Sequence, residues 1–345
     1  MGVLSLPFLI VAGFHGLILL VLAVDLGILH RKAHTVSMKE AAVWSIVWVS
    51  LALLFAFVGV RNYWHLWDPQ DPNAGPAKAL EFITGYLVEF SLSVDNLFVF
   101  LVIFRYFAVP EHLRHRVLVW GIVGAVLLRA GFILFGAALL HWFHWISYVF
   151  AAILLWTAYR LARSVEAEID PGKNPMLRLA RRLLPVVQDY ESPTFWVRRD
   201  GRWHATPLPL VLLVVETTDV MFAFDSIPAI FGITRDPFIV YTSNIFAILG
   251  LRSLYFLLAN FLGLFRYLNL GLSAVLGFVG LKMLIEEPLG PTLDAWSIGP
   301  TERILFSLGT IIAILSVAVV ASIWAGPKEV LEHPPEAGAE GPPAS

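Results

Sequence analysis

Two apolar stretches of the chain contain acidic residues in the same arrangement. An acid is followed after five residues by Asp and then by a small polar residue, and the six positions are Glu89, Asp95, Asn96, Asp219, Asp225 and Ser226. An ionised carboxylate at the centre of a bilayer costs about 2.5–3.5 kcal/mol on insertion scales. Bound cations or protons are therefore expected to compensate these acids.

The ligand chemistry of these positions favours a hard divalent cation. Carboxylate, amide and hydroxyl oxygens suit Mg, Ca or Mn better than Cu or Zn, which take imidazole or thiolate more readily. The chain contains no cysteine, which excludes disulfides, thiolate metal sites and thiol redox chemistry. Met221, between the two acids of the second stretch, would shift the preference toward Mn if its thioether were a ligand.

Helical geometry limits how the acids of one stretch can act together. Six residues turn an α-helix by about 240°, so Glu89 and Asp95 do not share a face of a straight helix. Either the acids serve different neighbours or the helix is locally unwound. In the second stretch, Pro228 cannot donate to the carbonyl of Phe224, and this predicts a free backbone oxygen beside Asp225 as a further ligand.

The composition is that of an integral membrane protein. Of the 345 residues, 58% are hydrophobic and 14% are charged, compared with about 25% charged residues in soluble domains. The net charge of -2 gives no indication of a nucleic-acid partner. Membrane lipid is the expected surrounding, and the apolar run 7–29 is too long for a signal-peptide core and is expected to be a retained helix.

The hydropathy pattern predicts an all-α, polytopic fold with about nine transmembrane helices. A span needs about 20 apolar residues, and suitable windows fall near 7–29, 41–60, 80–104, 117–140, 143–162, 208–231, 239–262, 266–285 and 303–324. Only 141–144 separates the fourth and fifth windows, which predicts a tight hairpin.

Basic residues alternate between the loops, and this alternation predicts the orientation. Loops after the first, third and fifth spans are rich in Lys and Arg, which places the N-terminus outside and the C-terminus in the cytoplasm. The third and sixth spans then run in opposite directions, and Arg129 and Arg252 lie deep in the spans that follow them. We infer an inverted repeat of three helices plus three, the arrangement of many secondary transporters.

The predicted spans and loops divide the chain into six segments. The segments are two peripheral helices with an external loop (1–79), the first repeat (80–162), a cytoplasmic linker (163–207), the second repeat (208–286), the last helix (287–325) and a disordered tail (326–345). The linker is expected to contain a basic helix around Arg178 to Leu184 and a β-hairpin that turns at Asp200-Gly201. The tail is rich in Pro, Glu, Gly and Ala, a composition typical of disorder.

Several of these stretches closely resemble the TerC/Alx family. The resemblance runs from about residue 20 to 325 and is carried by 91–96, 206–208, 216–219, 222–229 and the pair 25–27 and 30–31. It implies a fold related to the LysE-type exporters and manganese export across the bacterial cytoplasmic membrane. Carried over by position, Glu89, Asp95 and Asn96 match the first acidic motif of the family, and Glu216, Asp219, Asp225 and Ser226 match the second.

The leading hypothesis is a secondary-active Mn²⁺ exporter driven by proton exchange, because the chain has no ATP-binding motif. Mn²⁺ would be its substrate, and no organic cofactor is expected. Buried acids could instead form structural salt bridges with Arg129, Arg252 and Lys282, and the arginines are then counter-ions. Export of Ca²⁺ or another divalent ion, a scaffold for the metalation or assembly of other proteins, and an intramembrane aspartyl protease are the alternatives. The oligomeric state and the role of Asp25 stay open.

Overall fold

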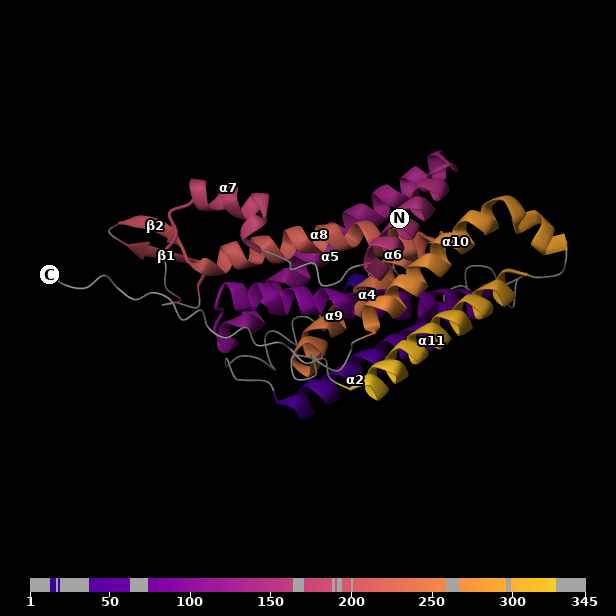
Figure 1. The fold of residues 1–345 in the computed structure, drawn as a ribbon, viewed down its shortest axis with the longest axis horizontal. Helices are drawn as coiled ribbons and strands as arrows, with labels where there is room; N and C mark the ends of the chain where they lie inside the picture. Colours follow the sequence, from indigo (N-terminus) through magenta and orange to yellow (C-terminus); the bar gives the residue numbers. More distant parts are fainter. Residues whose placement is uncertain are drawn as a thin grey trace, which may run out of the picture.

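The structure, a computed structural model, describes residues 13–16, 18, 37–62, 74–163, 171–187, 190, 194–199, 201–258, 267–295 and 299–326. These residues form a helical bundle with one small β-hairpin (Figure 1). The long helices are α2 (Met38–Leu54), α4 (Ala74–Tyr106), α5 (Glu111–Trp142), α6 (Ile146–Arg163), α8 (Pro207–Phe231), α9 (Pro237–Leu258), α10 (Leu268–Ala295) and α11 (Pro300–Ala325). The π-helix η2 (Phe55–Val60) continues α2.

Local sequence signals explain where several helices begin. Proline occupies the first helical position of α8, α9 and α11, where its missing N–H costs nothing. The Asp236 carboxylate accepts hydrogen bonds from the amides of Phe238 and Ile239 and caps α9, and Ser37 caps α2 through the amide of Glu40. Side-chain caps of this kind satisfy amides that the first turn leaves without partners.

The membrane prediction agrees with the helices of the described residues. A helix occupies each predicted window from 41–60 to 303–324. Six of these segments are long and apolar enough to cross a membrane: Met38–Val60, Ala74–Tyr106, Glu111–Trp142, Pro207–Phe231, Leu268–Leu289 and Pro300–Ala325. Helix α6 has 18 residues, and the apolar part of α9 covers Pro237–Leu251. Most of the window 7–29, Asp25 and the tail after 326 lie outside the described residues.

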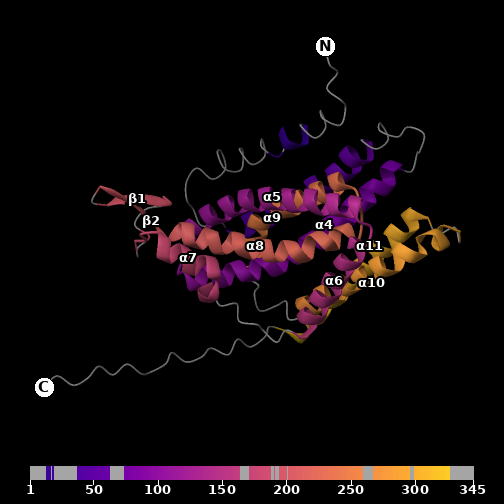
Figure 2. The ribbon, with the colours of Figure 1, turned by 90° about the horizontal axis from the view of Figure 1, so that it is seen from above.

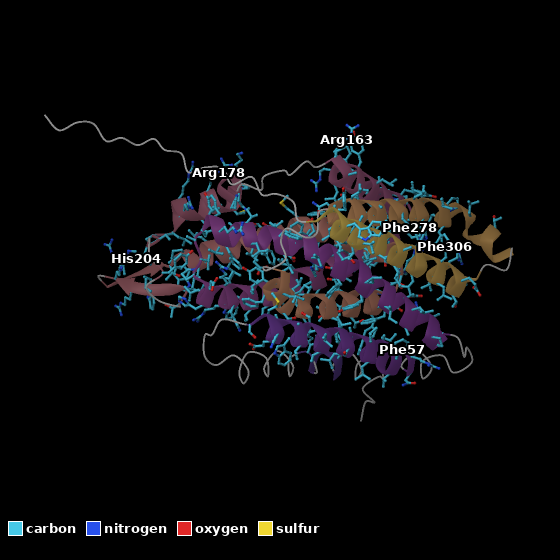
Figure 3. The ribbon with its side chains drawn as sticks, turned by 60° about the horizontal axis from the view of Figure 1, so that its bottom comes forward. Phe57, Arg163, Arg178, His204, Phe278 and Phe306 are labelled. Carbon is cyan, nitrogen blue, oxygen red and sulfur yellow. The ribbon has the colours of Figure 1, made fainter. Side chains whose placement is uncertain are left out.

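The helices form two groups. Helices α4, α5, α8 and α9 run side by side, and α2 packs on α9, whereas α6, α10 and α11 form a second group at an angle to the first (Figure 2). In the second group Phe278 of α10 lies against Phe306 of α11, with ring centroids 6.1 Å apart (Figure 3). Helices α4 and α8 contact both groups and therefore lie at the junction between them.

The turn between α5 and α6 is as tight as predicted, but the two helices do not form a packed pair. Helix α5 ends at Trp142 and α6 begins at Ile146. Helix α6 then packs chiefly on α10, where the Ser273 hydroxyl donates to the carbonyl of Ala158 at 2.7 Å. Close approach is possible because Gly280 of α10 faces Leu154 of α6.

The linker contains the predicted helix and hairpin. The basic helix is α7 (Pro175–Leu183), and strands β1 (Trp196–Arg199) and β2 (Arg202–Ala205) pair antiparallel. Gly201 has φ +74°, a conformation that suits a two-residue hairpin turn, and Asp200 lies outside the described residues. Arg178 and His204 extend from this end of the molecule (Figure 3). The hydroxyl of Tyr190 donates to the carbonyl of Phe107, and burial raises the pKa of Tyr190 to about 12.

Candidate functional site

A cluster of buried polar side chains lies where α4, α5, α8 and α9 meet. Glu89 of α4, Arg129 of α5 and Asn244 of α9 are each 0% exposed, and Asp219 of α8 is 3% exposed. Each side chain comes from a different helix. The bundle therefore brings together one acid from each predicted motif, which lie 130 residues apart in the sequence.

Arg129 joins the two acids. Its Nη2 lies 3.1 Å from Oδ1 of Asp219 and its Nε 3.4 Å from Oδ2, so the guanidinium faces both oxygens of this carboxylate. Its Nη1 forms an ion pair with Oε1 of Glu89. Two-pronged contacts of this type suit the planar guanidinium, and they add geometric specificity to the charge attraction. The salt bridges that the sequence suggested for Arg129 are thus present.

Neutral side chains complete the cluster. Asn244 accepts a hydrogen bond from Nη1 of Arg129 at 2.7 Å and donates one to Oε2 of Glu89 at 3.3 Å. The hydroxyl of Ser226 lies 3.5 Å from Nη1, and Ser93 donates to Oε1 of Glu89 at 3.4 Å. Glu89 and Ser93, four residues apart, therefore lie on one face of α4. Asn244 was missed, although the polar run 242–244 inside an apolar span is a signal for it.

The electrostatics of the cluster favour a cation. Two carboxylates and one guanidinium leave one net negative charge when all three groups are ionised. Charges removed from water are costly unless they are paired and hydrogen-bonded, and here each charged group has such partners. A site with two carboxylates, an amide oxygen and a hydroxyl offers only oxygen ligands, which are the ligands of Mg, Ca and Mn.

Asp225 lies in a different environment from Asp219. The hydroxyl of Thr157 in α6 donates to Oδ1 of Asp225 at 2.7 Å, and Arg160 lies 3.9 Å from Oδ2. Helix α8 continues without interruption from Asp219 through Pro228. Of the two possibilities raised by the spacing, the acids therefore serve different neighbours. Helical opening at Phe224 is not observed, and a ligand role for its carbonyl stays a prediction.

The other motif residues are not partners of Arg129. Asp95 is half-buried in α4 and Asn96 is 3% exposed. Within the described part of the chain, Nδ2 of Asn96 and Oε2 of Glu216 have no hydrogen-bond partner. Glu216 packs against Gly124 of α5, where a Cβ would lie 2.2 Å from its Oε1. The hydrogen bonds of Arg129 go instead to Glu89, Asp219, Ser226 and Asn244.

The expectation for Lys282 needs correction, and Met221 lies apart from the cluster. Lys282 does not pair with the acids of the motifs, since its Nζ donates to the carbonyl of Gly232 at 3.2 Å and lies 3.4 Å from Glu286. Met221 is 64% exposed, so its thioether points away from the cluster. The side chain of Arg252 lies outside the described residues.

Outside the cluster, a polar cavity of about 300 Å³ lies beyond the end of α8. Its charged lining residues are Arg235, Glu286, Glu287 and Arg303, and Arg235 pairs with Glu287. No group of three or more His, Asp or Glu side chains suited to a metal occurs in the part of the chain that the structure describes. Glu89 and Asp219, one acid from each motif, both pair with Arg129.

Comparison with known proteins finds one membrane-protein family and several similar membrane proteins. The model of the Integral membrane protein TerC family matches residues 74–329. An uncharacterized membrane protein of Myxococcus xanthus is 46% identical over 331 residues, which cover 96% of this chain and 95% of the relative. The "Putative membrane-bound redox modulator Alx" of Salmonella typhi is 46% identical over 90% of this chain and 93% of its own.

A further relative, which matches over a shorter stretch, is found in a plant. The chloroplastic thylakoid membrane protein TERC of Arabidopsis thaliana is 47% identical over 212 residues, which cover 61% of this chain and 55% of that protein. No solved structure matches the chain. The relatives therefore share a membrane location.

Proposed function

Because the chain belongs to the TerC family of integral membrane proteins, we propose that it exports a divalent metal ion, Mn²⁺ in the first instance, in exchange for protons. The bacterial cytoplasmic membrane is the proposed location. One observation carries the proposal: Glu89 and Asp219, one acid from each motif, converge on Arg129 in the interior of a membrane bundle. Ionisable residues inside a membrane span commonly mark ion pathways.

In the proposed cycle the empty site holds the guanidinium of Arg129, which offsets one acid, and a proton on the acid pair, which offsets the other. An arriving divalent ion competes with the guanidinium for the oxygens of Glu89 and Asp219. Metal ligands must be deprotonated, so metal binding releases the proton. A proton that returns to the acid pair when the ion leaves restores the starting charge and accounts for exchange.

The helix contacts support an inverted repeat. With α4, α5 and α6 as one unit and α8, α9 and α10 as the other, α4 packs on α9 as α8 packs on α5. The third helices of the two units, α6 and α10, pack on each other. Exchange of the units leaves these contacts unchanged, as a pseudo-two-fold axis would require. The cluster has members from both units, which fits a substrate site at the interface of two repeats.

Ca²⁺ or another divalent ion is the alternative substrate, because the same oxygen ligands suit it. The relatives named for redox modulation point to a second role. With no cysteine in the chain, such a role cannot use thiol chemistry of its own, and an effect of metal export on other redox proteins would account for it. A scaffold role in metalation or assembly of other proteins predicts activity that survives loss of the acids.

The test is Mn²⁺ transport by the purified full chain in proteoliposomes that contain a manganese-sensitive dye. We expect an imposed pH gradient to drive Mn²⁺ transport, and Glu89→Gln and Asp219→Asn to reduce the rate at least tenfold. Glu111→Gln is the control, because Glu111 is 70% exposed at the start of α5. Unchanged transport in folded Glu89→Gln and Asp219→Asn proteins would refute the proposal. Ca²⁺ competition in the same vesicles ranks the two ions.

The six-residue site predicted from sequence is tested in the same assay. Asp95 and Asp225 lie outside the Arg129 cluster. If Asp95→Asn and Asp225→Asn lose as much transport as Asp219→Asn, both residues belong to the ion pathway. Transport at the level of Glu111→Gln would restrict the site to the cluster.

A further inference from the structure

We propose that Asn244 is a ligand of the transported ion, and that the ion occupies the position that Nη1 of Arg129 holds in this structure. This inference rests on the proposed function. Asn244 belongs to neither acidic motif and lies on α9, which contributes no acid to the cluster.

The position of Nη1 has the character of a cation site. This nitrogen contacts Glu89 of α4, Ser226 of α8 and Asn244 of α9. Each of the three contacts is made by an oxygen, and the adjacent nitrogen of the same guanidinium faces Asp219. A divalent ion at this position would meet one carboxylate, one amide oxygen and one hydroxyl from three helices, and the carboxylate of Asp219 lies beside the neighbouring nitrogen.

The orientation of the Asn244 amide is fixed by its partners. Arginine has only donors, so the atom that faces Nη1 at 2.7 Å must be the carbonyl oxygen Oδ1. The amide nitrogen is then directed at the carboxylate of Glu89, at 3.3 Å. The hydrogen bond to Glu89 therefore holds Oδ1 toward the place where positive charge lies, whether that charge is the guanidinium or a metal ion.

Burial strengthens this argument. Asn244 is 0% exposed, and so are Glu89 and Arg129. If the guanidinium moved away without replacement, Oδ1 would be a buried acceptor with no partner, which is costly. An incoming ion removes this cost, because amide carbonyls coordinate Ca²⁺ at about 2.3–2.6 Å and suit Mn²⁺ as well.

The experiment measures Mn²⁺ affinity by calorimetry on the purified full chain. Asn244→Leu removes the oxygen at similar size, and Asn244→Ser keeps a hydroxyl that is too short to reach the ion. Thr242→Val is the matched control, since Thr242 is equally buried on α9 but donates to the carbonyl of Phe238 in its own helix. We expect at least a fivefold loss of Mn²⁺ affinity in both Asn244 variants and less than twofold in the control.

A double-mutant cycle separates a ligand from a residue that only positions Arg129. In an Arg129→Gln background, a ligand role predicts that Asn244→Leu still weakens Mn²⁺ binding at least fivefold. A role that acts only through Arg129 predicts no further loss, and that result would overturn the inference. Asn244→Ser serves the same comparison if Asn244→Leu fails to fold.

The outcome is distinct from a failure of the proposed function. If the wild-type protein neither binds nor transports Mn²⁺ or Ca²⁺, the proposed function itself fails, and the inference fails with it. If the wild type binds and transports the ion while folded Asn244→Leu and Asn244→Ser bind it within fivefold of wild type, only the role of Asn244 is refuted.

Discussion

At the scale of single residues, Arg129 determines the character of the site. Two acids from different helices bind its guanidinium, Glu89 at Nη1 and Asp219 at Nη2. Its side chain is 0% exposed. The attraction within such a group compensates the cost of burying its members, so removal of one member leaves an uncompensated buried charge. Arg129 therefore has a structural role in addition to any role in transport.

Arg129→Leu is expected to destabilise the protein by about 3–5 kcal/mol, the usual cost of removing one partner of a buried pair. Thermal unfolding in detergent, followed by fluorescence or by loss of monodisperse protein, measures the change. Arg160→Gln is the control, because Arg160 is 62% exposed and lies 3.9 Å from Asp225; exposed pairs contribute at most about 1 kcal/mol. Adding Glu89→Gln and Asp219→Asn to Arg129→Leu should restore much of the lost stability. If the triple variant is as unstable as Arg129→Leu alone, the charge explanation is wrong.

At the scale of elements, close contact between α6 and α10 joins the two proposed repeats. The fit depends on small residues where the helices cross. A Cβ at Gly280 would lie 3.1 Å from the Cβ of Leu154 and 3.2 Å from the carbonyl oxygen of Ala151. Small residues at such crossings let the helix backbones approach closely in a membrane.

We predict that Gly280→Ala lowers the midpoint of thermal unfolding by several degrees, because the Leu154 side chain and the α6 backbone must move apart. Gly277→Ala, one turn away, is the comparison, since its Cβ would lie 3.7 Å from Ala158 in ordinary contact. That variant is expected to unfold at the wild-type temperature or slightly above it. Equal midpoints for the two variants would show that α6 and α10 pack less closely than the structure indicates.

At the scale of the whole molecule, α5 and α8 run in the same direction. The hairpin lies at the start of both helices, where Arg116 of α5 stacks on Phe195 and Thr206 donates to the carbonyl of Phe195. Their far ends meet at the other side, where Arg235 donates to Ser147. The bundle therefore has one end with the basic linker and another with the two short turns. The positive-inside rule predicts that the end with the linker faces the cytoplasm.

Cysteine labelling tests this orientation without background, because the chain has no cysteine of its own. A membrane-impermeant maleimide added to intact cells should label Trp145→Cys, in the exposed turn between α5 and α6. It should not label Arg178→Cys, on the exposed face of α7, until the membrane is permeabilised. The reverse pattern would invert the proposed topology and the direction of transport.

Local properties of the sequence account for the helices and for the residue types of the candidate site. Length and hydropathy are local properties, so the windows predicted α8 as 208–231 and α11 as 303–324, within three residues of the observed bounds. Helical period also separated the faces of Glu89 and Asp95, and the Asp-Gly pair located the hairpin. The proposed oxygen ligands follow from the residue types alone.

Which side chains meet depends on the packing of the helices against one another. The rotation of α8 directs Asp219 toward Arg129 and Asp225 toward α6, and this depends on the neighbours on each side of the helix. Asn244 is neutral and belongs to neither acidic motif, so its contact with Glu89 became evident only when α9 was placed beside α4. Contacts between residues 90 to 155 positions apart are set by packing of the whole bundle, which no local pattern in the chain encodes.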